Sequence, residues 1–181
     1  MRSFPRSVAT RGVLAVAMAA TLLSAGCGQA SPAVVAYVGD TAITQKQVET
    51  AVAAVSSTAE AGQTVSSEAV INAMIQGELS AQLARDRRIT ITDTDRDTFV
   101  RSTNLAPLLS VPAAKPIVYD VADQALVSEN VGAAAYLAEI EKRKVTLNPR
   151  YGVLDPKQKT IVTDQSGSLS QPATPPTPQA P

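Results

Sequence analysis

The chain has 181 residues, a length that suits one domain, and its 16 basic side chains are matched by 16 acidic ones. The sequence contains no histidine, which removes the usual general base, any Ser–His pair and most zinc sites.

The first 26 residues predict a lipoprotein signal peptide that is not part of the fold. Three arginines give it a positive start, and the apolar run over residues 13–23 is too short to span as a mature membrane helix. Because those arginines leave with the signal, acidic side chains are in slight excess in the chain that remains. This weak acidity argues against nucleic acid or an anionic lipid surface as the main partner.

The signal ends in Ser24-Ala25-Gly26-Cys27, and small residues directly before a lone cysteine resemble a bacterial lipobox. Leu23 lies one place earlier than in the commonest lipobox, with Ser24 in its stead. The resemblance implies cleavage before Cys27 and a lipid thioether on its sulfur, with residues 27–32 as a lipidated tether. We therefore expect a chain anchored by acyl chains, such as palmitate, to the extracytoplasmic face of the cell membrane. The alternative is an ordinary signal peptide with an incidental cysteine.

Residues 33–55 predict a strand, a tight turn, a short return strand and a helix. Residues 34–38 are β-branched, aromatic or small, as a strand tolerates, and Gly39-Asp40 is a turn pair between two extended runs. Thr44 and Gln47 fit a capping box, and apolar residues then follow at helical spacing. One face of this helix is therefore expected to be buried.

The longest predicted helix begins at Ser66 or Ser67 and ends near Arg87. Its apolar face contains an i,i+4 row made of Ile71, Ile75, Leu79 and Leu83. Gly77 in the middle of the helix costs roughly 1 kcal/mol relative to alanine, and a close helix crossing would account for it. The arginines at the end of the helix complement its dipole.

A third helix is predicted to begin after Thr92, which can act as its cap. Three aspartates between residues 93 and 97 also suggest a calcium loop. An EF-hand loop needs Gly at its sixth position and Glu at its twelfth, and the sequence has Thr98 and Asn104 there. We therefore interpret the aspartates as residues that favour a helix start.

Three prolines exclude one regular helix over residues 105–116. The apolar residues of this connector either plug the core or form an adaptable contact surface. An apolar stripe then predicts a helix from about residue 118, which either continues to Arg143 or restarts at Asn130.

The end of the chain carries two further extended segments and a biased tail. Residues 145–147 and 159–163 are predicted to be extended. Residues 165–181 are rich in Pro, Ser, Gln and Thr, which is typical of a disordered tail with polyproline character.

Three short signatures resemble the SurA N-terminal domain family, whose members are extracytoplasmic chaperones often fused to parvulin-type prolyl isomerase domains. The first is V-G-D-x-x-I-T over residues 38–44, and the second is A-x-x-x-x-I-x-I-T-D-x-D over residues 84–95. The family usually has a glycine where the second signature has Arg87 and Arg88. The third, V-x-L-N-P-R-Y-G over residues 145–152, resembles the ending of family lipoproteins that lack an isomerase domain.

Together these features predict a mainly α fold, a SurA N-terminal-like helical domain over residues 33–164. A small β element is expected to join strand 34–38 to the C-terminal extended segment near Val145 or Ile161. In the resembling family the C-terminal helix packs back on the N-terminal ones, and we expect the same arrangement.

The resemblance implies a non-catalytic, membrane-anchored chaperone that binds unfolded or newly exported polypeptides in an apolar groove between helices. Nothing after Asn104 fits an isomerase domain, and no cofactor or metal is expected. The alternative is a structural or adaptor lipoprotein that binds one fixed cell-envelope partner, with the Pro-rich tail as a spacer or ligand segment. The candidate peptide-binding residues, each of which could equally belong to the core, are Met74, Leu79, Phe99, Leu108 and Leu109.

Overall fold

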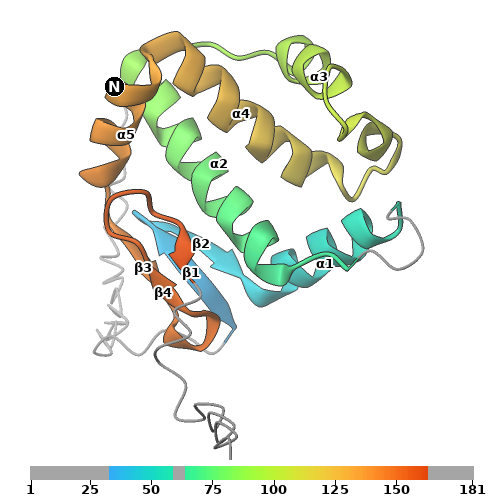
Figure 1. Ribbon diagram of the computed structural model, residues 1–181, viewed down its shortest axis with the longest axis horizontal. Coiled ribbons are helices and arrows are strands. Elements are labelled where there is room, and N and C mark those ends of the chain that lie inside the picture. The colour runs from blue at the N-terminus through green and yellow to red at the C-terminus, as the bar shows by residue number, and fades with distance from the viewer. Residues whose placement is uncertain (1–32, 59–63, 163–181) are drawn as a thin grey trace, which may run out of the picture.

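A computed structural model of the chain describes residues 33–58 and 64–162. The predicted signal peptide, Cys27, its tether and the Pro-rich tail lie outside these residues. The described chain is mainly helical, as the sequence predicts, with five α-helices and two small antiparallel sheets (Figure 1). The elements follow in the order β1 (Val34–Val38), β2 (Thr41–Thr44), α1 (Gln45–Ser56), α2 (Ser67–Arg87), α3 (Asp93–Arg101), the 3-10 helix η1 (Ala106–Ser110), α4 (Lys115–Val131), α5 (Ala133–Glu141), β3 (Val145–Leu147), the 3-10 helix η2 (Pro149–Tyr151), β4 (Val153–Leu154) and β5 (Ile161–Val162).

The larger sheet joins the two ends of the described chain. Its strand order is β2-β1-β3, and both pairings are antiparallel. The turn between β1 and β2 contains Gly39 at φ +57°, a conformation that favours glycine. Ala36 pairs with Leu147 and Val38 with Val145, so the segment near Val145 is the one that joins the first strand. The segment near Ile161 pairs with β4 in the second sheet instead.

Local capping signals set the starts of the first three helices. The Thr44 hydroxyl accepts from the Gln47 backbone N–H, and Gln47 Oε1 accepts from the Thr44 N–H at 2.8 Å. Thr92 and Asp95 form the same reciprocal box at α3, and Ser66 caps α2. These contacts satisfy N–H groups that a helix leaves without a partner at its first turn. The predicted caps of α1, α2 and α3 are thus confirmed.

Helix α2 is central to the fold and lies alongside α4 in Figure 1. Its i,i+4 row is fully buried, together with Val118 and Ala122 of α4. A Cβ atom at Gly77 would overlap the Cβ, Cγ and Oδ1 atoms of Asp120. The close helix crossing expected at Gly77 is therefore present, and it is a crossing with α4.

The helical stretch after the proline-rich connector is divided in two. Pro116 stands in the first turn of α4, where its missing N–H costs no hydrogen bond. The break comes at Gly132, at φ +86°, so α5 begins at Ala133. A restart at Asn130 is wrong by three residues, because Asn130 lies inside α4 and donates its amide to the Leu126 carbonyl.

The end of the described chain is attached to α2 by side-chain hydrogen bonds. Gln76 donates to the carbonyls of Gln158 and Lys159 at 2.8 and 3.0 Å. Asn72 Oδ1 accepts from the Ile161 N–H at 2.7 Å. The last described residues are thereby fixed along one side of α2.

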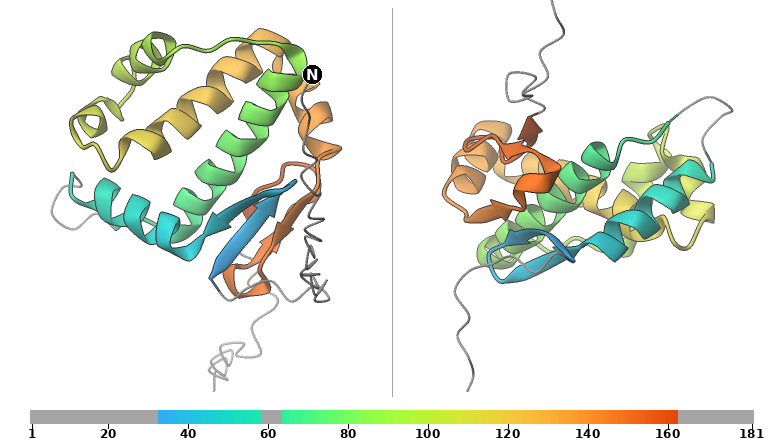
Figure 2. Two further views of the ribbon diagram at one scale, coloured as in Figure 1. Left: turned by 180° about the vertical axis from the view of Figure 1, so that it is seen from behind. Right: turned by 90° about the horizontal axis from the view of Figure 1, so that it is seen from below.

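The first helix takes a different direction. Figure 2 shows α1 running away from the sheet, while β4 and β5 stay beside it. None of the helices in residues 33–58 and 64–162 is long and apolar enough to cross a membrane.

Candidate functional site

An open-sided groove of about 320 Å³ lies between α1, α2 and the start of α4. This volume is near the lower end for ligand-binding pockets, so the groove suits a few side chains rather than a folded domain. We call it the α1–α4 groove. Its apolar lining residues are Ala51, Met74, Ala113, Pro116 and Ile117, and its polar ones are Thr44, Lys46, Gln47, Thr50 and Asp120.

Each wall of the α1–α4 groove follows from a local feature of the sequence. The capping box fixes the first turn of α1, and Ala51 lies on the buried face of that helix. Met74 is half-buried on α2, beside the fully buried Ile75. The third wall is the first turn of α4, which contains Pro116. The groove thus lies where three helices converge on the core.

The carboxyl group of Asp120 is the most unusual polar group of the groove. It forms no hydrogen bond or ion pair with any described residue. Burial raises the pKa of Asp120 to about 7, and the negative charges of Asp123 and Glu78 act in the same direction. Arg96 opposes this shift. The carboxyl group is therefore held in an environment that disfavours its charge.

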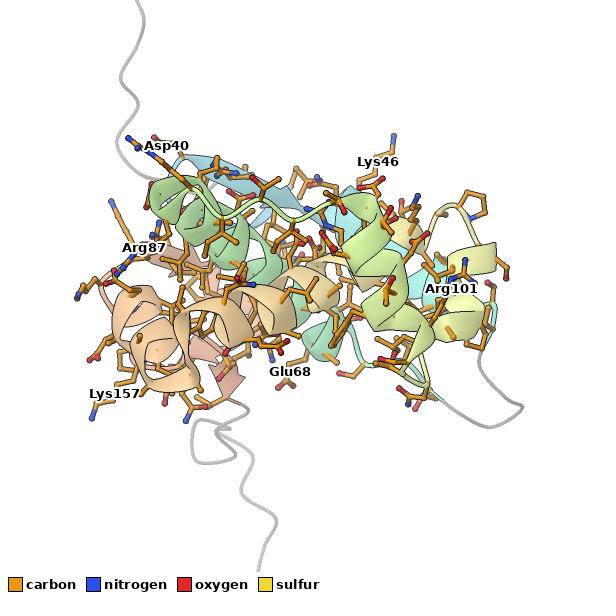
Figure 3. The ribbon with its side chains drawn as sticks, turned by 90° about the horizontal axis from the view of Figure 1, so that it is seen from above. Asp40, Lys46, Glu68, Arg87, Arg101 and Lys157 are labelled. Atoms are coloured by element: carbon orange, nitrogen blue, oxygen red, sulfur yellow. The ribbon has the colours of Figure 1, made fainter. Side chains whose placement is uncertain are left out.

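Lys46 lies on the rim of the groove and is exposed. Its side chain points away from the body of the molecule in Figure 3. Within the described residues it has no ion pair, with Asp120 or any other carboxylate. The charge of Lys46 therefore does not neutralise the interior of the groove.

Only one of the five candidate peptide-binding residues lines the α1–α4 groove, and that residue is Met74. Leu79 is 0% exposed and Leu108 is 5% exposed, so both belong to the core, which is the alternative that the sequence left open. Phe99 and Leu109 are half-buried against the core and lie outside the groove.

Sequence reasoning missed Asp120. It lies off the apolar stripe of its helix, where an exposed side chain is the natural expectation. Gly77 was the one available signal, because a mid-helix glycine suggested a close neighbour without showing which residue it is.

The aspartates at the start of α3 have structural partners. Asp93 pairs with Arg96, Asp95 completes the cap with Thr92, and Asp97 accepts from the Tyr119 hydroxyl at 2.7 Å. Across the described part of the chain, no group of three or more His, Cys, Asp or Glu side chains is placed to hold a metal ion. Asp93 and Asp95 lie in the first turn of α3, which is the helix start that the sequence predicts.

No protein-family model matches the chain, and neither a curated protein nor a solved structure does. The likeness to the SurA N-terminal domain family therefore depends on the three signatures in the sequence. What that likeness implies about function is a proposal.

Proposed function

We propose that the chain is a membrane-anchored, non-catalytic chaperone that binds unfolded or newly exported polypeptides on the extracytoplasmic face. The lipid on Cys27 would provide the anchor, and the fold would be of the SurA N-terminal type. The observation that supports binding is the α1–α4 groove, a mostly apolar recess that is open to solvent and has Met74 in its lining.

The groove suits adaptable rather than sequence-specific contacts. Methionine is flexible and polarizable, so Met74 can adjust to side chains of different shape. Small or rigid residues such as Ala51 and Pro116 form other apolar parts of the groove lining. Burying one Leu or Phe side chain of a client contributes about 1.5–3 kcal/mol, which an unfolded chain can provide at many points along its length.

Site-specific photo-crosslinking tests the groove as the binding site. A photoreactive residue at Thr50, in the groove, should crosslink to a chemically unfolded model protein but not to its folded form. The matched control is the same photoreactive residue at Lys157. This side chain is not part of the groove lining and lies at the opposite side of the molecule from Lys46 in Figure 3. Equal crosslinking from both positions, or none from Thr50, would contradict the proposal.

The second candidate function is an adaptor that binds one fixed cell-envelope partner. The observation that favours it is an exposed apolar pair on the small sheet, where Val153 and Val162 face each other and are 62% and 41% exposed. Crosslinking from Val153 to a single envelope protein, unaffected by added unfolded protein, would favour the adaptor over the chaperone.

A further inference from the structure

We propose that the α1–α4 groove selects segments in which a lysine is flanked by apolar residues, with the Asp120 carboxylate as the partner of the lysine ammonium. This inference deepens the proposed chaperone function and rests on it, because it names the class of segment that the same groove takes. Capture of a lysine-bearing apolar segment is more specific than the general apolar burial argued above.

The first argument is the chemistry of the groove walls. Asp120 shares the groove with Met74, Pro116 and Ile117. A lysine side chain has a four-carbon apolar stem and a charged tip, so the stem can cover apolar walls while the tip reaches a carboxylate. The groove offers both parts of this pattern.

The second argument is that the Asp120 carboxyl has room for a partner. It lacks a hydrogen-bond or ion-pair partner in residues 33–58 and 64–162, and a half-buried polar group without a partner costs free energy. Its Oδ1 atom is packed against Gly77 of α2. Because the backbone of α2 lies close to one oxygen, a single ammonium group fits better than the two-pronged guanidinium of arginine.

The third argument is charge complementarity. Glu78 of α2 and Asp123 of α4 add negative potential at Asp120. Arg96 of α3 is the nearby cation, but it is engaged by Asp123 at 2.7 Å and by Asp93 at 3.0 Å. Lys46 of α1 is exposed on the rim. Glu78 is itself paired with Arg85 at 3.2 Å. An entering ammonium group therefore meets the one carboxylate of this group that has no ion pair within the described residues, and it displaces no internal ion pair.

The Pro-rich segment of the chain is a competing occupant. Residues 165–181 contain no lysine or arginine, so this segment cannot provide the charge that Asp120 lacks. An exported polypeptide with a lysine among apolar residues can.

The test compares three labelled peptides that differ only at one position between apolar flanks: lysine, norleucine or glutamate. Fluorescence anisotropy at pH 8 would measure their binding to the chain from Gly28 to Pro181, which contains every described element. Norleucine keeps the apolar stem without the charge. We expect the lysine peptide to bind at least fivefold more tightly than the norleucine peptide, and the glutamate peptide to bind most weakly.

Variants assign this preference to Asp120. Asp120→Asn should remove the lysine preference, so that the lysine and norleucine peptides bind alike, whereas Asp40→Asn removes the same charge from an exposed turn and should leave the preference intact. The preference should also grow between pH 6 and pH 8 as Asp120 ionises. Circular dichroism would show that each variant is folded.

The outcomes separate the two claims. Equal binding of the lysine and norleucine peptides, or a preference that survives Asp120→Asn, would overturn the inference and leave the chaperone function standing. A complete absence of peptide binding would overturn both. Binding that appears only after removal of residues 165–181, without a lysine preference, would make that segment the occupant and also overturn the inference.

Discussion

At the scale of single residues, Asp120 is the side chain whose chemistry differs most from its behaviour in water. Its pKa is about 7 in the folded protein, against a usual value of 3.8. The folded protein therefore holds this proton more tightly than the unfolded chain does. By linkage, the contribution of Asp120 to the free energy of unfolding is fully present below about pH 4 and is lost as pH rises to about 7. Above that pH the free energy of unfolding no longer changes through Asp120.

Substituting Asp120 by asparagine should remove this pH dependence. We expect Asp120→Asn to raise the free energy of unfolding at pH 8 by about 2–4 kcal/mol, because the amide has the same shape and no charge to bury. Between pH 4 and 7 the stability of the variant should be nearly constant. Urea unfolding at four or five pH values would measure both effects.

The loss of stability at acidic pH is expected to be the same in wild type and in Asp120→Asn, so it serves as an internal reference for the comparison. Asp95, Glu139 and Asp155 have lowered pKa values, because hydrogen bonds from Thr92, from Arg87 and from the backbone of residues 157 and 158, respectively, favour their charged forms. Their contributions are lost as pH falls below about 4, in wild type and variant alike. A variant whose stability still declined between pH 4 and 7 would contradict the assignment to Asp120.

Gly77 gives the second prediction at the residue scale. Gly77→Ala should destabilise the protein by about 1–3 kcal/mol, because the new methyl group overlaps Asp120 and pushes α2 and α4 apart. Helix propensity alone predicts the opposite sign, a gain of about 1 kcal/mol. The midpoint of urea unfolding distinguishes the two, and a more stable variant would show that the helices do not meet closely at Gly77.

At the scale of elements, the run Asn148-Pro149-Arg150-Tyr151-Gly152 is a structural connection. Asn148 is buried, and its amide donates to the Val34 carbonyl at 3.0 Å, while its Oδ1 accepts from the Arg150 N–H at 3.2 Å. One side chain thus fixes the start of β1 and caps η2. The third signature of the sequence therefore has, in this fold, a local packing reason.

Replacing that side chain should loosen the C-terminal elements. We expect Asn148→Ala to cost about 1–3 kcal/mol, because the Val34 carbonyl is left buried without the amide donor. Asn130→Ala is the matched control, since the amide of Asn130 is exposed and bonds to Leu126 in its own helix. Equal losses from both substitutions would contradict the role given to Asn148.

The helix starts could be predicted from the sequence because their causes are local. A capping box such as Thr44 with Gln47 lies within four residues of the chain. The pairing of the last extended segments could not be predicted, because β1 has compatible partners near Val145 and near Ile161 and only long-range packing decides between them.

The candidate site was predicted only in part, for a related reason. Helical periodicity shows which face of a helix is apolar, but not what covers that face. It therefore could not separate Met74, which lines the α1–α4 groove, from Leu79, which is sealed in the core. Asp120 was missed because its burial depends on the crossing of two helices distant in sequence.

At the scale of the whole molecule, α2 separates two regions with different roles. Asn72 and Gln76 are about one helical turn apart and hold the C-terminal strands on one side. Met74, two residues from each, faces away from that side and toward the groove. Attachment of the C-terminal strands therefore leaves the α1–α4 groove open, as the chaperone proposal requires.

The most direct test of this account is suppression of aggregation. The chain from Gly28 to Pro181 would be mixed with a chemically unfolded model protein on dilution, and light scattering would be followed against molar ratio. Ala113→Trp, at an exposed lining residue, should fill the groove, and Ala138→Trp adds the same ring on the exposed face of α5 as the control.

We predict suppression near a stoichiometric ratio for wild type and Ala138→Trp, competition by a generic unfolded peptide, and loss of most of the effect in Ala113→Trp. Absence of suppression at several-fold excess of folded wild-type chain, or full activity in Ala113→Trp, would contradict the account.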